Sequence, residues 1–72
     1  MKIFVTGVNG FIGSHFLEMA LAQTDWEIQG FDLADNNITQ FLDNPRFSMK
    51  KGDIFKEEAW LNEQIKECDV LL

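Results

Sequence analysis

The stretch "MKIFVTGVNGFIGSH", residues 1–15, decides the fold, because three glycines recur in it at a spacing of three residues. Gly7, Gly10 and Gly13 stand between an apolar run and an amphipathic one. Glycine in or beside regular structure costs roughly 0.5–1 kcal/mol relative to alanine, so the backbone must need its freedom there. The apolar run before the glycines, residues 3–5, predicts a strand buried on both faces, as strands of parallel sheets are.

From Phe11 onward the apolar residues follow the period of a helix. The spacing predicts a helix from Phe11 to about residues 23–25 with one buried face. The apolar stripe that we expect on this face consists of Ile12, Phe16, Met19 and Ala20, widened by Leu17 and Leu21.

The rest of the chain continues to alternate between strand and helix patterns. Strands are predicted at 26–31 and 46–51, and residues 69–72 begin a fourth. Asn36 or Asn37 is expected to cap a short helix that reaches about residue 42, because Pro45 prevents its continuation. A further helix is expected over 56–67, with Trp60 or Leu61, Ile65 and Cys68 on its apolar face.

The order β-α-β-α-β-α-β implies parallel strands, right-handed crossovers and helices on the faces of the sheet. We therefore predict an α/β fold, the N-terminal part of one Rossmann-type doubly wound parallel sheet, spanning residues 1–72 and incomplete by itself. The expected strand order is 3-2-1-4. This order leaves the fourth strand, residues 70–72, as an open apolar edge that favours self-association.

Composition excludes several classes of function. The chain has 72 residues, a formal net charge of −6 and a pI near 4.4, which disfavours binding to nucleic acid. No apolar run has the length of a signal peptide core or a membrane span, so the cytoplasm is the expected compartment. Cys68 is the only cysteine, which argues against a structural zinc site and predicts no metal centre.

The glycine run lies where a strand turns into a helix, and there the first N–H groups of the helix lack internal partners. A pyrophosphate can be held by these donors without any basic side chain. In this interpretation Gly7 permits the tight turn, Gly10 lets the backbone approach the ligand, and Gly13 lets the helix pack closely. Phe11 and Ile12, at the helix start, belong to the predicted binding residues. The loop has no lysine, which argues against a nucleoside-triphosphate P-loop.

Two aspartates favour the interpretation of the glycine run as a dinucleotide-binding turn rather than as a turn without a ligand. Asp32 lies 19 residues after Gly13, at the end of the second strand, where a carboxylate binds the adenosine ribose and repels a 2′-phosphate. Asp32 therefore predicts NAD in preference to NADP. Asp53 follows the third strand at the same edge, although taken alone it fits a solvated loop better.

Other polar residues leave alternatives open. Asn9 could donate to the pyrophosphate or favour the turn, and turn chemistry is slightly preferred. Asn36 could cap the short helix or lie beside the ribose. His15 is expected to be a surface or interfacial histidine rather than a catalyst, and Cys68 a small buried hydrophobe without a redox role. Trp26 and Trp60 are expected to pack between the sheet and its helices.

Two motifs carry a resemblance to a known family. "TGVNGFIG", residues 6–13, resembles the Thr-Gly-x-x-Gly-x-x-Gly pattern of the extended short-chain dehydrogenases/reductases, the nucleotide-sugar epimerase and dehydratase group. It departs from the other branch of these enzymes, because Phe11 stands where that branch requires glycine. "GDI", residues 52–54, resembles the adenine-contacting turn of the group. The resemblance implies that the Asp53 carboxylate lies near the adenine amino group and that Ile54 packs on the ring.

The resemblance extends over all 72 residues, which amount to less than a third of such a domain. Within the group it favours the UDP-glucuronic acid decarboxylases of the bacterial lipid A aminoarabinose pathway, which are fused to a formyltransferase. It implies NAD as cofactor, a UDP-sugar as substrate and a homo-oligomer. A UDP-sugar 4-epimerase, a 4,6-dehydratase, and a non-catalytic dinucleotide-binding or assembly module remain as alternatives.

Catalysis in this group uses a Tyr-x-x-x-Lys pair, in which the tyrosine acts as base and the lysine lowers its pKa. The chain contains no tyrosine. We therefore expect no catalytic residue among residues 1–72. The resemblance places the pair after residue 72 of a parent chain, and this segment carries the cofactor half of the site.

Overall fold

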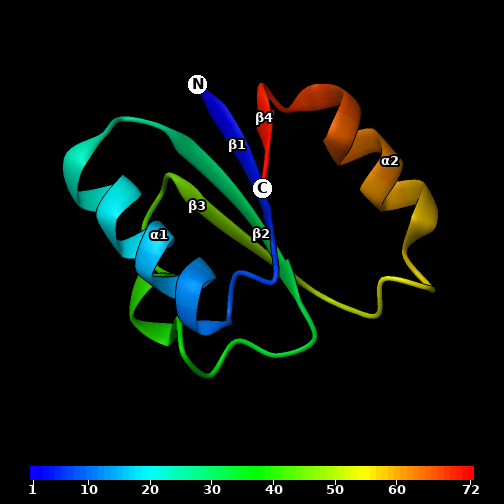
Figure 1. Ribbon diagram of the computed structural model, residues 1–72, viewed down its shortest axis with the longest axis horizontal. Helices are drawn as coiled ribbons and strands as arrows, with labels where there is room; N and C mark the ends of the chain where they lie inside the picture. Colours follow the sequence, from blue (N-terminus) through cyan, green and yellow to red (C-terminus); the bar gives the residue numbers. More distant parts are fainter.

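A four-stranded parallel sheet forms the centre of the computed structural model, which describes all residues 1–72 (Figure 1). Its strands are β1 (Lys2–Thr6), β2 (Glu27–Asp32), β3 (Phe47–Lys51) and β4 (Val70–Leu71). They lie in the order β3-β2-β1-β4. The predicted α/β class, parallel pairing and strand order are confirmed.

Helices cover both faces of the sheet. Helix α1 (Phe11–Gln23) and the short 3₁₀ helix η1 (Thr39–Phe41) lie on one face, and α2 (Glu58–Glu67) lies on the other (Figure 1). Successive residues of β1 point to opposite faces, so Ile3 and Val5 pack towards α1 while Phe4 packs towards α2. All three side chains are buried, which confirms the two-sided burial expected of this strand.

The two faces differ in the size of their cores. The α1 face holds nine buried residues, namely Ile3, Val5, Val8, Leu17, Ala20, Leu21, Ile28, Ile38 and Phe47. The α2 face holds only Phe4, Phe31 and Leu61, with Trp60 and Cys68 packed beside them. Trp60 contacts Phe4 edge-on at 5.9 Å between ring centroids, and Trp26 packs against the larger cluster, as expected of both tryptophans.

The buried face of α1 matches the predicted one only in part. Leu17, Ala20 and Leu21 are buried, but Ile12 is 82% exposed and Met19 53% exposed. The reason is that α1 approaches the sheet through Gly13, and Leu17, Ala20 and Leu21 follow Gly13 at i+4, i+7 and i+8. Phe16 packs half-buried against the core, whereas Ile12 and Met19, at the outer side of the predicted stripe, are exposed.

The segment after β2 also differs from the expected short helix. Only the single turn of η1 forms, its N-cap is Ile38, and no side chain caps it. Asn36 and Asn37 do not cap a helix, because their polar atoms bind Asn9 on the neighbouring loop. The predicted capping role of both residues is therefore wrong.

Helix α2 begins two residues later than expected. The N–H groups of Lys56 and Glu57 donate to the carbonyl of Asp53 at 2.9 and 3.1 Å, so the chain makes a turn before Glu58. Leu61 is buried and Cys68 is half-buried, whereas Ile65, expected on the apolar face, is exposed.

Arg46, immediately before β3, fastens the end of α1 to the sheet. Its guanidinium donates to the carbonyls of Leu21 at 2.6 Å, Thr24 at 2.7 Å and Trp26 at 3.1 Å. A cation at a helix C-terminus donates to carbonyls that have no partner within the helix, and it is attracted to the negative end of the helix dipole. Arg46 thus fixes the position of α1 at the end opposite to the glycines.

The β4 edge generates the first prediction. Val70, Leu71 and Leu72 are exposed, and β4 pairs with β1 on one side only. An open apolar edge strand recruits other strands, so we expect the 72-residue chain to self-associate or to be poorly stable. Sedimentation velocity and thermal melting test this expectation.

A variant with a charge on β4 tests whether this edge causes the association. Leu71→Lys should reduce association because charge on an edge strand opposes pairing, whereas Leu42→Lys, on an exposed loop away from the edge, should not. A monodisperse wild-type monomer with a cooperative melt would contradict the prediction.

Candidate functional site

The carboxyl ends of the parallel strands meet at one edge of the sheet. In the observed register Thr6 pairs with Phe31, and Asp32 pairs with Lys51. The chain leaves β1 for β2 and β3 on one side and later returns to β4 on the other side of β1. Such a reversal opens a crevice beyond the strand ends, and open α/β sheets bind ligands there.

The glycine turn enters this crevice between β1 and α1. Gly7 has a φ of +68°, which residues with a side chain rarely adopt, and its N–H donates to the Phe31 carbonyl at 2.8 Å. A Cβ atom on Gly13 would lie 2.4 Å from the Gly7 carbonyl oxygen and 2.9 Å from the Val8 Cα. Only glycine at position 13 therefore lets α1 start directly against the turn.

The start of α1 presents free hydrogen-bond donors. The backbone N–H groups of Phe11, Ile12 and Gly13 make no hydrogen bond, and no acidic side chain lies in the first turn. These groups carry the positive end of the helix dipole. The arrangement suits an anion, and a phosphate group needs no lysine or arginine to bind there.

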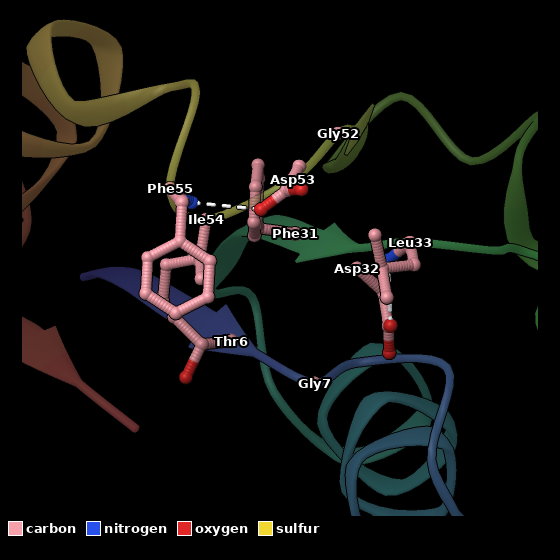
Figure 2. Close-up of a pocket in the computed structure, with 9 residues that line it drawn as sticks. All are labelled: Thr6, Gly7, Phe31, Asp32, Leu33, Gly52, Asp53, Ile54 and Phe55. Carbon is pink, nitrogen blue, oxygen red and sulfur yellow. Dashed lines mark hydrogen bonds between the residues drawn. The ribbon is translucent and has the colours of Figure 1, made fainter.

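A pocket of about 330 Å³ lies beside the glycine turn, between the ends of β1, β2 and β3 (Figure 2). This volume is within the range of small-molecule sites, roughly 300–1,000 Å³. The residues that line it are Thr6, Gly7, Phe31, Asp32, Leu33, Gly52, Asp53, Ile54 and Phe55. Three predicted binding residues, Asp32, Asp53 and Ile54, are thus brought together with Gly7.

Asp32 is held in a fixed orientation at the end of β2. Its Oδ2 accepts a hydrogen bond from the Asn9 N–H at 2.9 Å, and its Oδ1 accepts one from the Leu33 N–H at 2.7 Å. Figure 2 shows its carboxylate directed towards the turn that enters α1. Each oxygen has two lone pairs, so the carboxylate can still accept hydrogen bonds from ligand hydroxyls.

Asp53 organises the turn after β3. Its Oδ1 accepts a hydrogen bond from the Phe55 N–H at 2.8 Å, drawn as a dashed line in Figure 2. The turn leaves Ile54 exposed and Phe55 91% exposed beside the pocket. Exposed apolar side chains beside a pocket can cover the face of an aromatic ligand. The adenine contacts of Asp53 and Ile54 stay predictions.

A second cavity, of about 710 Å³, lies on the other side of the glycine turn, towards β4. It is lined by Val5, Thr6, Gly7, Gly10, Phe11, Ile12, Gly13, Phe16 and Leu72. Thr6 and Gly7 line both cavities. An extended ligand can therefore cross the glycine turn with one end in each cavity.

Two polar residues near the turn bind other parts of the protein. Asn9 is buried and its side chain faces the loop after β2, where it binds Asn36 and the backbone of Asn37. His15 is exposed, and its Nδ1 lies 2.8 Å from the Phe11 carbonyl oxygen. It is the surface histidine that the sequence favours.

The sequence interpretation did not place Leu33 or Phe55 in the site. Both are apolar residues that directly follow a predicted site residue, Asp32 or Ile54, and this signal could have identified them. No group of three or more His, Cys, Asp or Glu side chains is placed to hold a metal ion. Neither helix combines the length and apolar character that crossing a bilayer requires.

Solved structures similar to this chain come from nucleotide-sugar enzymes and related proteins. The PbgP3 protein from Burkholderia pseudomallei is 36% identical over 97% of this chain, with a TM-score of 0.91. A dTDP-glucose 4,6-dehydratase from Bacillus anthracis, solved with NAD, is 38% identical over 97% with a TM-score of 0.75. A UDP-glucuronic acid 4-epimerase from Bacillus cereus, solved with UDP-glucuronic acid and NAD, is 32% identical over 100% with a TM-score of 0.84.

The chain spans 21%, 24% and 25% of the lengths of these three proteins, respectively. One family model matches residues 3–72, from β1 to the end of β4, and so includes the glycine turn and both aspartates. The expected NAD cofactor agrees with the definition of that family. The chain belongs to the NAD dependent epimerase/dehydratase family.

Proposed function

We propose that residues 1–72 form the NAD-binding segment of a nucleotide-sugar-modifying oxidoreductase. One observation carries the proposal. The free N–H groups at the start of α1 and the fixed carboxylate of Asp32 flank the same glycine turn, at the reversal of the strand order. These are the two groups that bind a pyrophosphate and a ribose in dinucleotide sites.

The residues present fit such a cofactor. The free N–H groups of Phe11, Ile12 and Gly13 would hold the pyrophosphate. Gly7 and Gly10 would let it approach, because they carry no side chain. Asp32 would bind the adenosine ribose. Asp53 and Ile54 would contact the adenine in the 330 Å³ pocket. The cofactor, when bound, supplies a hydride acceptor for a sugar hydroxyl.

The reaction we propose for the full-length protein is oxidative decarboxylation of UDP-glucuronic acid to a UDP-4-keto-pentose. The motif resemblance over the whole chain supports it, as does similarity to a solved enzyme that acts on UDP-glucuronic acid. A UDP-sugar 4-epimerase and a 4,6-dehydratase are the competing activities, since both occur among the similar structures. By the same resemblance, the full-length protein would be a cytoplasmic homo-oligomer with a fused formyltransferase domain.

The activity is tested by incubating the full-length protein with UDP-glucuronic acid and NAD. We expect CO₂ and NADH to form in equal amounts, measured by gas trapping and by absorbance. UDP-galacturonic acid as the product would instead establish the 4-epimerase. Loss of water from dTDP-glucose, with no turnover of UDP-glucuronic acid, would establish the dehydratase.

Cofactor preference depends on Asp32. Because its carboxylate accepts hydrogen bonds from ribose hydroxyls and repels a 2′-phosphate, the full-length protein should bind NAD more tightly than NADP. Asp32→Ala should weaken NAD binding roughly 10- to 100-fold, the range for hydrogen bonds to a charged group, with little change for NADP. Isothermal calorimetry measures both constants. Equal affinity of the wild type for the two cofactors would count against the assigned role.

The glycine turn can be tested separately. Gly10→Val places a branched side chain where the pyrophosphate would lie, so NAD affinity should fall at least tenfold, roughly the loss of charge-assisted hydrogen bonds. Ala22→Val is the matched control, because it puts the same side chain on the exposed surface of α1. Circular dichroism should show the fold retained in both variants. Normal NAD binding by Gly10→Val would contradict the role of the turn.

A further inference from the structure

Asn9 is the only polar side chain among the buried residues, at 9% exposed, and it lies inside the glycine turn. A buried amide is costly unless its donors and acceptors are satisfied. Its placement beside the proposed pyrophosphate site suggests at first a direct contact with the cofactor. Its hydrogen bonds indicate a different role.

The polar side-chain and backbone atoms of Asn9 bind the segment that follows β2. Its Nδ2 donates to the Asn36 Oδ1 at 3.0 Å, and its Oδ1 accepts from the Asn37 N–H at 2.7 Å. Its carbonyl accepts from the Asn37 Nδ2 at 2.9 Å. Its own N–H donates to the Asp32 Oδ2 at 2.9 Å. The amide is thus engaged by the loop that follows β2.

These bonds close the loop of residues 33–38 against the glycine turn. Asp32 anchors the start of the loop at the end of β2, and Ile38, which is fully buried in the core on the α1 face, anchors its end. Asn9 holds the middle. Without the side-chain bonds of Asn9, the Asn9 and Leu33 N–H groups would still bind the Asp32 carboxylate at the end of β2. The turn that carries Asn9 and the loop that carries Leu33 would, however, no longer be tied to each other.

We propose that Asn9 is a positioning residue that sets the cofactor preference through Asp32. By fastening the loop, it keeps the carboxylate at the distance from the glycine turn that the ribose and pyrophosphate of NAD require. The fixed carboxylate also stays where a 2′-phosphate would lie, so it repels NADP fully. This inference rests on the proposed NAD-binding function of the segment.

The test compares the binding of NAD and NADP to the full-length protein carrying Asn9→Ala. Two neutral hydrogen bonds are lost, so NAD affinity should fall roughly 5- to 20-fold. NADP affinity should change less than about twofold. A mobile carboxylate repels the 2′-phosphate less, and this gain in NADP affinity offsets the affinity that is lost because the loop is less ordered. The NAD-to-NADP affinity ratio should therefore fall. Thr39→Ala, at the exposed first residue of η1 directly after the loop, should change neither affinity.

A double-mutant cycle separates positioning from a general loss of structure. If Asn9 acts through Asp32, Asn9→Ala should have almost no further effect on NAD affinity in an Asp32→Ala background. A merely structural role would lower the affinity for both cofactors by the same factor and would be additive with Asp32→Ala. Either of those results overturns the proposal.

A second variant covers the case in which Asn9→Ala does not fold. Asn36→Ala combined with Asn37→Ala removes the partner side chains, both of which belong to exposed residues, and leaves the buried amide in place. It should lower the NAD-to-NADP ratio in the same direction, and an unchanged ratio would overturn the inference. If the wild type binds neither cofactor, the proposed function itself fails, which is a distinguishable result.

Discussion

The close approach of Gly13 to the Gly7 carbonyl is the constraint on which the rest of the structure depends. Because a Cβ atom would lie 2.4 Å from that oxygen, glycine alone allows α1 to begin directly after β1. This contact sets which face of α1 meets the sheet, and so selects Leu17, Ala20 and Leu21 for the core. It also leaves the first N–H groups of the helix free at the carboxyl edge.

The two ends of α1 are fixed by different means. The glycine contact holds its N-terminus, and the three carbonyl bonds of Arg46 hold its C-terminus beside the start of β3. The end of the helix that presents the free N–H groups is therefore held in place before any ligand arrives. A site that is already ordered loses less entropy on binding, which favours affinity.

The polar network around Asn9 joins two segments that are 23 to 28 residues apart in the sequence. The glycine turn and the loop after β2 each supply part of the proposed cofactor site, and neither has regular secondary structure. Hydrogen bonds between them replace the packing that fixes helices and strands. Both polar side-chain atoms of the buried amide have a partner, so the network orders the site without leaving a buried polar atom unpaired.

The sequence by itself determined the order and type of the main elements, the strand order and the meeting of Gly7, Asp32 and Asp53 at one edge. Those features follow from local periodicity and from the rule that parallel crossovers are right-handed. The tertiary structure decided which residues of the broad apolar stripe of α1 are buried, because the backbone contact of Gly13 fixes the rotation of the helix. It also directed Asn36 and Asn37 to Asn9 instead of a helix cap, since such bonds depend on which loops fold side by side.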